Sequence, residues 1–155
     1  MGVIRKIIQL ICQRPMTGKG KILVIEDEPG VSMMAVYLLT QAGCEVQTAW
    51  NAEKGMQLAQ TGGFSLITMS VNLSGMNGFE ICRRLKQIPH LNNTPIVFVS
   101  DRATIENQQL ALALGAVDYI TKPFDALDFV SRILSHVSNN DDSGLVEAIP
   151  ESSMA

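Results

Sequence analysis

The sequence has few of the residues that build disulfide frameworks, metal centres or redox pairs. Its 155 residues include only three cysteines and two histidines. The cysteines are Cys12, Cys44 and Cys82, an odd number at wide spacings, and none belongs to a CxxC pair. A disulfide framework or a zinc site is therefore not expected, and the expected compartment is a reducing cytoplasm.

Signatures of several other functional classes are also missing. No apolar run approaches the roughly 18 to 20 residues of a membrane span, and Arg5, Lys6 and Gln9 interrupt the stretch that a secretory signal would need. The chain has no GxxxxGK[ST], no GxGxxG after the first strand, no GxSxG and no HExxH. The net charge of −3 argues against non-specific nucleic-acid binding. The sequence therefore lacks the usual motifs of nucleotide-binding proteins and hydrolases.

The apolar residues follow a pattern typical of an α/β domain. They make up 46% of the chain, which is enough for a core. Short β-rich runs, each followed by a helical pattern, occupy residues 21–26, 44–49, 65–70, 95–100 and 117–121. The runs are almost continuously apolar, as expected for strands covered on both faces. We therefore predict a parallel sheet with helices on both sides, joined by right-handed crossovers.

Residues with strong capping or stop preferences mark the expected helix ends. The first helix starts at Pro29 and stops at Gly43, and Asn51 caps the second. Asn77 and Glu80 resemble a capping box for the third. The remaining signals are Gly115, which ends a helix near 104–114, and Asp125, which caps the last helix.

Charge divides the chain into three parts: a basic extension at 1–19, a domain at 20–138 and an acidic, disordered tail at 139–155. Within the extension, residues 3–14 carry apolar side chains at near-helical spacing with basic residues between them. One interpretation is a short amphipathic helix that contacts an anionic membrane or a partner. The favoured interpretation is a frayed extension, or a true start at Met16.

Polar residues gather where the expected strands end, which is where open α/β sheets bind ligands. The strand ends bring together acidic, hydroxyl and cationic groups: Glu26, Asp27 and Glu28; Ser70 and Asn72; Ser100 and Asp101; Thr121 and Lys122. Neighbouring carboxylates are a plausible Mg²⁺ site, and a lysine with a hydroxyl suits a phosphoryl oxygen. A solvated loop that caps the first helix explains the acids equally well. For Lys122, spacing alone favours an ion pair with Glu26 or Asp27.

Four stretches together resemble the receiver domain of bacterial two-component response regulators. They read ILVIEDEP, VNLSGMNGFEICRRLK, TPIVFVS and GAVDYITKPF, and they lie in the family's order and spacing across residues 20–138. The resemblance implies a flavodoxin-like (βα)5 fold with sheet order 2-1-3-4-5. It also implies a set of site residues: Glu26, Asp27 and the Asn72 carbonyl for Mg²⁺, Ser100 and Lys122 for the phosphoryl group, Tyr119 as the switch aromatic and Pro123 as a cis proline.

The resemblance breaks at the phosphoacceptor. The family's aspartate at the end of the third strand corresponds to Ser70, and a one-residue slip would place Met69 or Val71 there on the wrong face. A serine hydroxyl forms no acyl phosphate, and no general base is evident beside it. With one carboxylate fewer, Mg²⁺ affinity should fall. We expect Lys122 to pair with Asp27 and to hold the site in one conformation.

Three functions stay open from the sequence. The favoured one is a non-enzymatic receiver-like module in two-component (phosphorelay) signalling that works by protein contact without aspartyl phosphorylation. A second is phosphorylation of Ser70 or another acid at the site, and a third is a metal-dependent enzyme or small-ligand binder using the same residues. Under the first, the partner is a histidine kinase or an output protein. It would bind the face formed by the helix near 104–114, strand 117–121 and the helix after Asp125, with no direct nucleic-acid contact. A monomer or a weak homodimer is expected.

Overall fold

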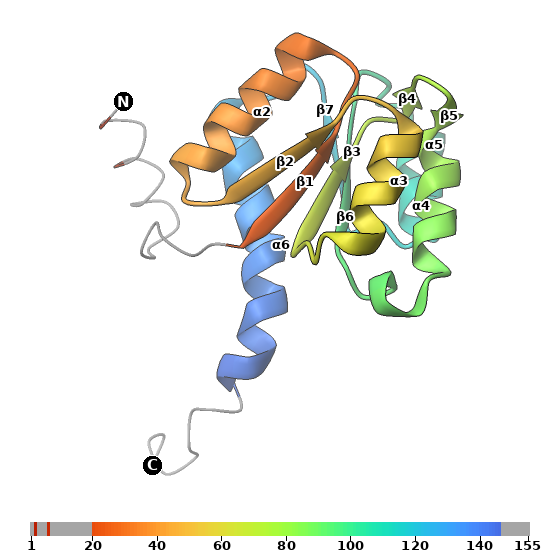
Figure 1. The fold of residues 1–155 in the computed structure, drawn as a ribbon. Helices are drawn as coiled ribbons and strands as arrows, with labels where there is room; N and C mark the ends of the chain where they lie inside the picture. The colour runs from red at the N-terminus through yellow and green to blue at the C-terminus, as the bar shows by residue number, and fades with distance from the viewer. Residues whose placement is uncertain (1, 3–5, 7–19, 147–155) are drawn as a thin grey trace.

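A computed structural model describes the backbone of residues 2, 6 and 20–146 and the side chains of 20–137 within that range (Figure 1). The predictions about residues 3–14 and about the end of the acidic tail lie outside the described residues. The strands are β1 (Lys21–Ile25), β2 (Glu45–Ala49), β3 (Leu66–Met69), β4 (Asn72–Leu73), β5 (Met76–Asn77), β6 (Ile96–Ser100) and β7 (Asp118–Thr121). The helices are α2 (Pro29–Gln41), α3 (Ala52–Thr61), α4 (Gly78–Lys86), α5 (Ile105–Ala113), α6 (Ala126–Val146) and the short 3₁₀ turn η1 (Pro89–Leu91).

The central sheet has the predicted flavodoxin-like topology. Its five strands are parallel and follow the order β2-β1-β3-β6-β7, which is 2-1-3-4-5 when only these strands are counted. All five apolar runs became strands of this sheet. β1 lies between β2 and β3, and the sheet's free edges belong to β2 and β7.

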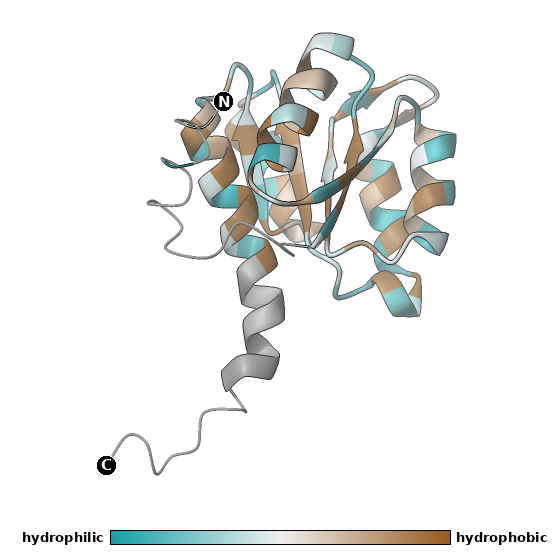
Figure 2. Ribbon diagram, turned by 60° about the vertical axis from the view of Figure 1, so that its left-hand side comes forward, coloured by the Kyte–Doolittle hydropathy of each residue, from teal (hydrophilic) through white to brown (hydrophobic). Residues whose placement is uncertain are grey.

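Helices cover both faces of the sheet, so successive strand residues enter two separate cores (Figure 1). On one side, α3, α4 and α5 bury Leu23 and Ile25 of β1. On the other, α2 and α6 bury Ile22 and Val24. The strands are apolar along their length because both faces are buried, as the hydropathy colouring shows (Figure 2).

Side-chain caps begin several helices as the sequence predicts. Asn51 accepts a hydrogen bond from the Lys54 amide at 2.8 Å, and Asp125 accepts one from the Asp128 amide at 2.8 Å. The capping box at α4 is only half formed. Asn77 accepts from the Phe79 amide at 2.8 Å, but the Glu80 carboxylate turns to two arginines of the same helix.

Three features differ from the expected pattern. The turn-rich loop after β3 contains the two-residue antiparallel strands β4 and β5, and Gly75 between them has a φ of +95°. The turn η1 had no clear sequence signal. The last helix continues to Val146, beyond residue 138, after which the tail was expected to begin. No helix in the described ranges is long and apolar enough to cross a membrane.

Candidate functional site

The polar strand ends meet at one rim of the sheet, as the topology requires. Backbone hydrogen bonds continue the ladder just past the strands and fix neighbouring positions. The Ser70 amide donates to the Ile25 carbonyl at 3.0 Å, and the Lys122 amide donates to the Ser100 carbonyl at 2.8 Å. Glu26 comes directly after β1, which pairs with β3, the strand that ends just before Ser70. Lys122 comes directly after β7, which pairs with β6, the strand that ends at Ser100.

An ion pair between Lys122 and Glu26 dominates this rim. The Lys122 Nζ lies 2.6 Å from the Glu26 Oε1, and the two side chains are 9% and 4% exposed. The other carboxylate oxygen of Glu26 accepts the Glu28 amide at 3.1 Å. Burial raises the pKa of Glu26 because water no longer solvates the charged form, while Lys122 opposes this shift. Both oxygens of Glu26 are thus already engaged within the protein.

The other two acids after β1 are placed differently from each other. Lys122 has a second, longer contact of 3.5 Å to the largely exposed Glu28. Asp27 is half-buried and accepts a hydrogen bond from the Ser74 hydroxyl at 3.5 Å. The expected pairing of Lys122 with Asp27 is therefore wrong. Glu26 takes this place because its side chain is buried beside the lysine, whereas Asp27 lies nearer the β4–β5 hairpin.

Ser70 is buried, with 5% of its surface exposed, directly after the buried strand β3. The loop that follows turns back tightly against it. The Gly78 amide donates to the Val71 carbonyl at 2.6 Å, and a Cβ on Gly78 would lie 2.1 Å from the Ser70 carbonyl oxygen. Only glycine fits this close backbone approach, so the chain returns against the Ser70 backbone at Gly78, where α4 begins. Asn72, which begins that hairpin, is exposed.

Ser100 and Tyr119 are linked through the loop after β6. The Ser100 side chain is buried, and its hydroxyl oxygen accepts the Arg102 amide at 3.2 Å. The Tyr119 hydroxyl donates to the Arg102 carbonyl. The ring of Tyr119 is buried, lies 6.3 Å from the Phe98 ring, and therefore points inward. Pro123 follows Lys122 through the predicted cis peptide bond.

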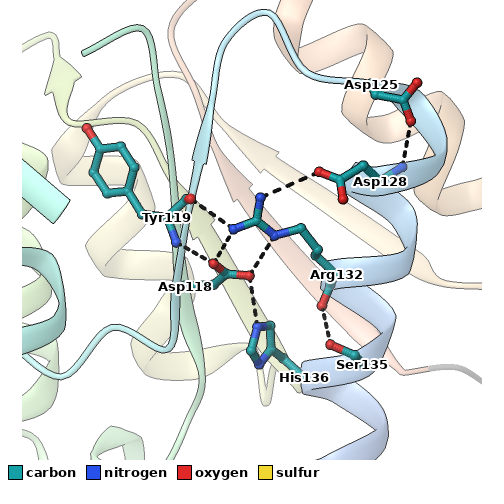
Figure 3. Close-up of polar contacts among 7 residues, drawn as sticks. All are labelled: Asp118, Tyr119, Asp125, Asp128, Arg132, Ser135 and His136. Atoms are coloured by element: carbon teal, nitrogen blue, oxygen red, sulfur yellow. Dashed lines mark hydrogen bonds and ion pairs between the residues drawn. The ribbon is translucent and has the colours of Figure 1, made fainter. Parts of the chain in front are cut away.

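A polar cluster that the sequence analysis missed ties β7 to α6 (Figure 3). Arg132 holds the Asp118 carboxylate with two nitrogen atoms and also donates to the Tyr119 carbonyl at 3.0 Å. His136 reaches the same carboxylate at 3.1 Å. Burial alone would raise the pKa of Asp118, but the hydrogen bonds from Arg132, His136 and the Tyr119 amide outweigh it, and the pKa is lowered. The start of β7, which carries Tyr119, is thus tied to α6 by side-chain hydrogen bonds.

Comparison with known proteins identifies the family. The family model described as the response regulator receiver domain matches residues 22–134. The chain belongs to this family. Among its relatives is the uncharacterized transcriptional regulatory protein YkoG of Bacillus subtilis, 34% identical over 122 residues, which are 79% of this chain and 53% of that protein. The phosphate regulon transcriptional regulatory protein PhoB of Rhizobium meliloti is 34% identical over 113 residues, 73% of this chain and 50% of that protein.

Solved structures of receiver domains agree with the fold. A putative response regulator from Chloroflexus aurantiacus has a TM-score of 0.74 at 27% identity, over 77% of this chain and 98% of that chain. The chemotaxis response regulator CheY4 of Vibrio cholerae has a TM-score of 0.70 at 28% identity, over 79% of this chain and 99% of that chain. The chain spans about half the length of the regulatory proteins named above.

Receiver domains typically bind Mg²⁺ at the phosphorylation site, which allows a fit test on this rim. Mg²⁺ needs charged oxygen ligands in near-octahedral geometry. Glu26 has both oxygens engaged, Ser70 supplies no anion, and Asp27 accepts a hydrogen bond from Ser74. Among the described residues no group of three His, Cys, Asp or Glu side chains could hold a metal ion. The rim of this receiver domain therefore fits Mg²⁺ poorly.

Sequence reasoning missed three contacts of this receiver domain's rim. Glu28 assists Glu26 at Lys122, Ser74 bonds Asp27, and Arg102 connects Ser100 with Tyr119 through its backbone. The contact of Tyr119 with the Arg102 carbonyl could not be predicted, because every residue has a backbone carbonyl whatever its side chain.

Proposed function

We propose that this receiver domain signals by contact with a protein partner and without aspartyl phosphorylation. The observation that supports this is Ser70, a buried hydroxyl at the end of β3 where the family has its acceptor aspartate. A receiver is phosphorylated when a carboxylate attacks phosphorus and becomes an acyl phosphate. Serine offers no carboxylate, and Asp27, an acid directly after β1, accepts a hydrogen bond from Ser74.

The state of the rest of the rim supports the same proposal. A receiver lysine that binds a phosphoryl oxygen must be available to it, yet Lys122 is paired to Glu26 at 2.6 Å. Tyr119 already points inward and bonds the Arg102 carbonyl. In our proposal this arrangement is held by the chain itself, so partner binding requires no chemical step at the rim.

Phosphorylation of Ser70 by a serine kinase is the weaker alternative. A kinase must bring the hydroxyl into its own active site in an extended segment, and Ser70 is only 5% exposed. Access to its hydroxyl would therefore require the structure around the end of β3 to open. No observation favours an enzyme, and the relatives are named as transcriptional regulators.

The proposed contact surface is the face built by α5, β7 and α6. The helix α5 exposes three large apolar side chains, namely Ile105 at 71%, Leu112 at 58% and Leu110 at 44%. Clustered apolar groups on a surface are typical of protein contact sites. The Asp118–Arg132 pair fixes β7 against α6 and so gives this face a rigid frame. The partner in this proposal is a cytoplasmic histidine kinase or output protein.

Backbone amide NMR with a phosphoryl analogue tests the proposal. Beryllofluoride and Mg²⁺ would be added to the ¹⁵N-labelled natural chain and to Ser70→Asp. We expect the Ser100, Tyr119 and Lys122 amides to shift only in Ser70→Asp. Shifts of the same amides in the natural chain would refute the proposal, because they would show a rim that still accepts a phosphoryl group. Ser70→Ala is the matched control and should behave like the natural chain.

A further inference from the structure

An apolar groove lies on the opposite side of the molecule from α5, between α2 and the edge strand β2. Its volume is about 580 Å³, within the range of sites that seat several side chains. Exposed apolar groups dominate it: Met33 is 72% exposed and Trp50 is 67% exposed. The groove is lined by Pro29, Ser32, Met33, Val36, Tyr37, Thr40, Gln41, Thr48 and Trp50. None of the helices or strands described for residues 20–146 covers it.

We infer that residues 3–14 of this chain dock in the groove as a short helix. Apolar side chains stand at positions 3, 4, 7, 8, 10 and 11, which is the spacing of one helical stripe. Such a stripe needs an apolar surface, because an isolated helix of this length is marginal in water. The family match begins at residue 22, so the segment adds to the receiver domain and the inference goes beyond the proposed function.

Residues 3–14 join the domain at a position from which they can reach the groove. The Glu45 amide at the start of β2 donates to the Gly20 carbonyl at 3.0 Å, so the segment joins the domain beside the base of β2. The C-terminal end of α2, with Gln41 in the groove wall, lies at the same base because the chain turns there into β2. Residues 15–19 can span up to about 17 Å, and a helix over 3–14 is about 18 Å long. That matches the length of α2, about 20 Å.

Charge complementarity sets the direction of the docked segment. An acid stands at each end of the groove, namely Glu28 beside Pro29 and the exposed Glu45 at the base of β2. The segment has bases at both of its ends, with Arg5 and Lys6 near the start and Arg14 near the end. With Arg14 near Glu45, the helix runs parallel to α2 and brings Arg5 toward Glu28. Exposed pairs add little energy but favour one orientation.

The tether favours this segment over other occupants. A short flexible connection gives an effective concentration in the millimolar range, so modest apolar contact suffices. A second copy of the chain or an anionic membrane would have to compete with it.

Trp50 is the only tryptophan of the chain and reports directly on the groove. Acrylamide quenching would compare the full natural chain with I4Q/I8Q/I11Q, which removes the stripe, and with Gln13→Asn as the matched control. Covering about half of the exposed ring should roughly halve the quenching constant. We expect low constants in the natural chain and the control, independent of protein concentration, and about a twofold higher constant in the triple variant. Equal constants in all three chains would overturn the inference.

Two other results would also overturn it. Protection that grows with protein concentration would assign the groove to a second copy, and protection seen only with phosphatidylglycerol vesicles would assign the segment to membranes. A cross-link tests the direction, because position 11 of the apolar stripe lies near the Arg14 end of the segment and should come close to Thr40 in the groove wall. Oxidation of I11C/C12S/T40C with copper phenanthroline should give an internal disulfide within the monomer. Gln60→Cys, on α3, is the control and should give none.

Discussion

The ion pair between Glu26 and Lys122 allows a worked prediction about the rim. Both side chains are almost fully buried, so removal of one charge leaves the other without its main partner. Fully buried pairs broken in this way lose about 3–5 kcal/mol, but here Lys122 keeps its contact with Glu28 at 3.5 Å. We therefore expect Glu26→Gln to lower the free energy of unfolding by about 2 kcal/mol near pH 7.

The partner variant Lys122→Met should depend on pH. Burial already raises the pKa of Glu26, and loss of the lysine removes a contribution that lowers it. The folded state then binds a proton that the unfolded state has released, so stability is intact below the unfolded pKa and falls as pH rises through the folded one. Measured at pH 5 and at pH 8, the loss should be larger at the higher pH, and it should grow by at most about 1.4 kcal/mol per pH unit between the unfolded and the folded pKa of Glu26.

Urea unfolding of the two single variants and the double variant, at both pH values, measures the coupling. The double variant should recover most of the lost stability, because neither charge is left unpaired. If both single variants stayed within about 0.5 kcal/mol of the natural chain at both pH values, the pair would not organise the rim. Stability losses that simply add in the double variant would contradict the reasoning equally.

Three further predictions concern other contacts and are checked by the same unfolding measurements. Gly78→Ala should cost about 3 kcal/mol or more, because its Cβ would meet a backbone carbonyl at 2.1 Å, whereas Gly30→Ala, with no atom nearby, should cost nothing; equal effects would refute this. Val97→Ala should cost about 1–3 kcal/mol, since the side chain is fully buried. Arg132→Met should cost about 1 kcal/mol near pH 7. Because the pKa of Asp118 is lowered, that cost should shrink as pH falls below about 4, and a constant cost would contradict the assignment.

The sheet could be predicted because each strand carries its own evidence. Runs such as 21–26 and 95–100 are apolar on both faces, which only a sandwiched parallel strand requires. Caps at Asn51 and Asp125 were predictable because short polar side chains bond the helix start locally. Glu80 failed as a capping residue because two arginines one turn later offered it stronger, charged partners.

The sequence predicts which residues lie at the rim, but not which of them form the ion pair with Lys122. Parallel strands place Glu26, Ser70, Ser100 and Lys122 at one end of the sheet whatever their side chains do. The choice of Glu26 over Asp27 as partner of Lys122 depends on which carboxylate is buried, and adjacent residues in a sequence give no sign of that. The same holds for Asp118, whose partners Arg132 and His136 lie about one turn apart on the helix that follows β7.

The central claim is that this receiver domain has a rim without a phosphoacceptor, and intact mass tests it most directly. The natural chain and Ser70→Asp would be incubated with a small-molecule phosphodonor and Mg²⁺, and their masses compared. We predict an unmodified natural chain beside a variant that gains one phosphoryl group. A natural chain that gains the group would contradict the account, and peptide mapping would then locate the acceptor.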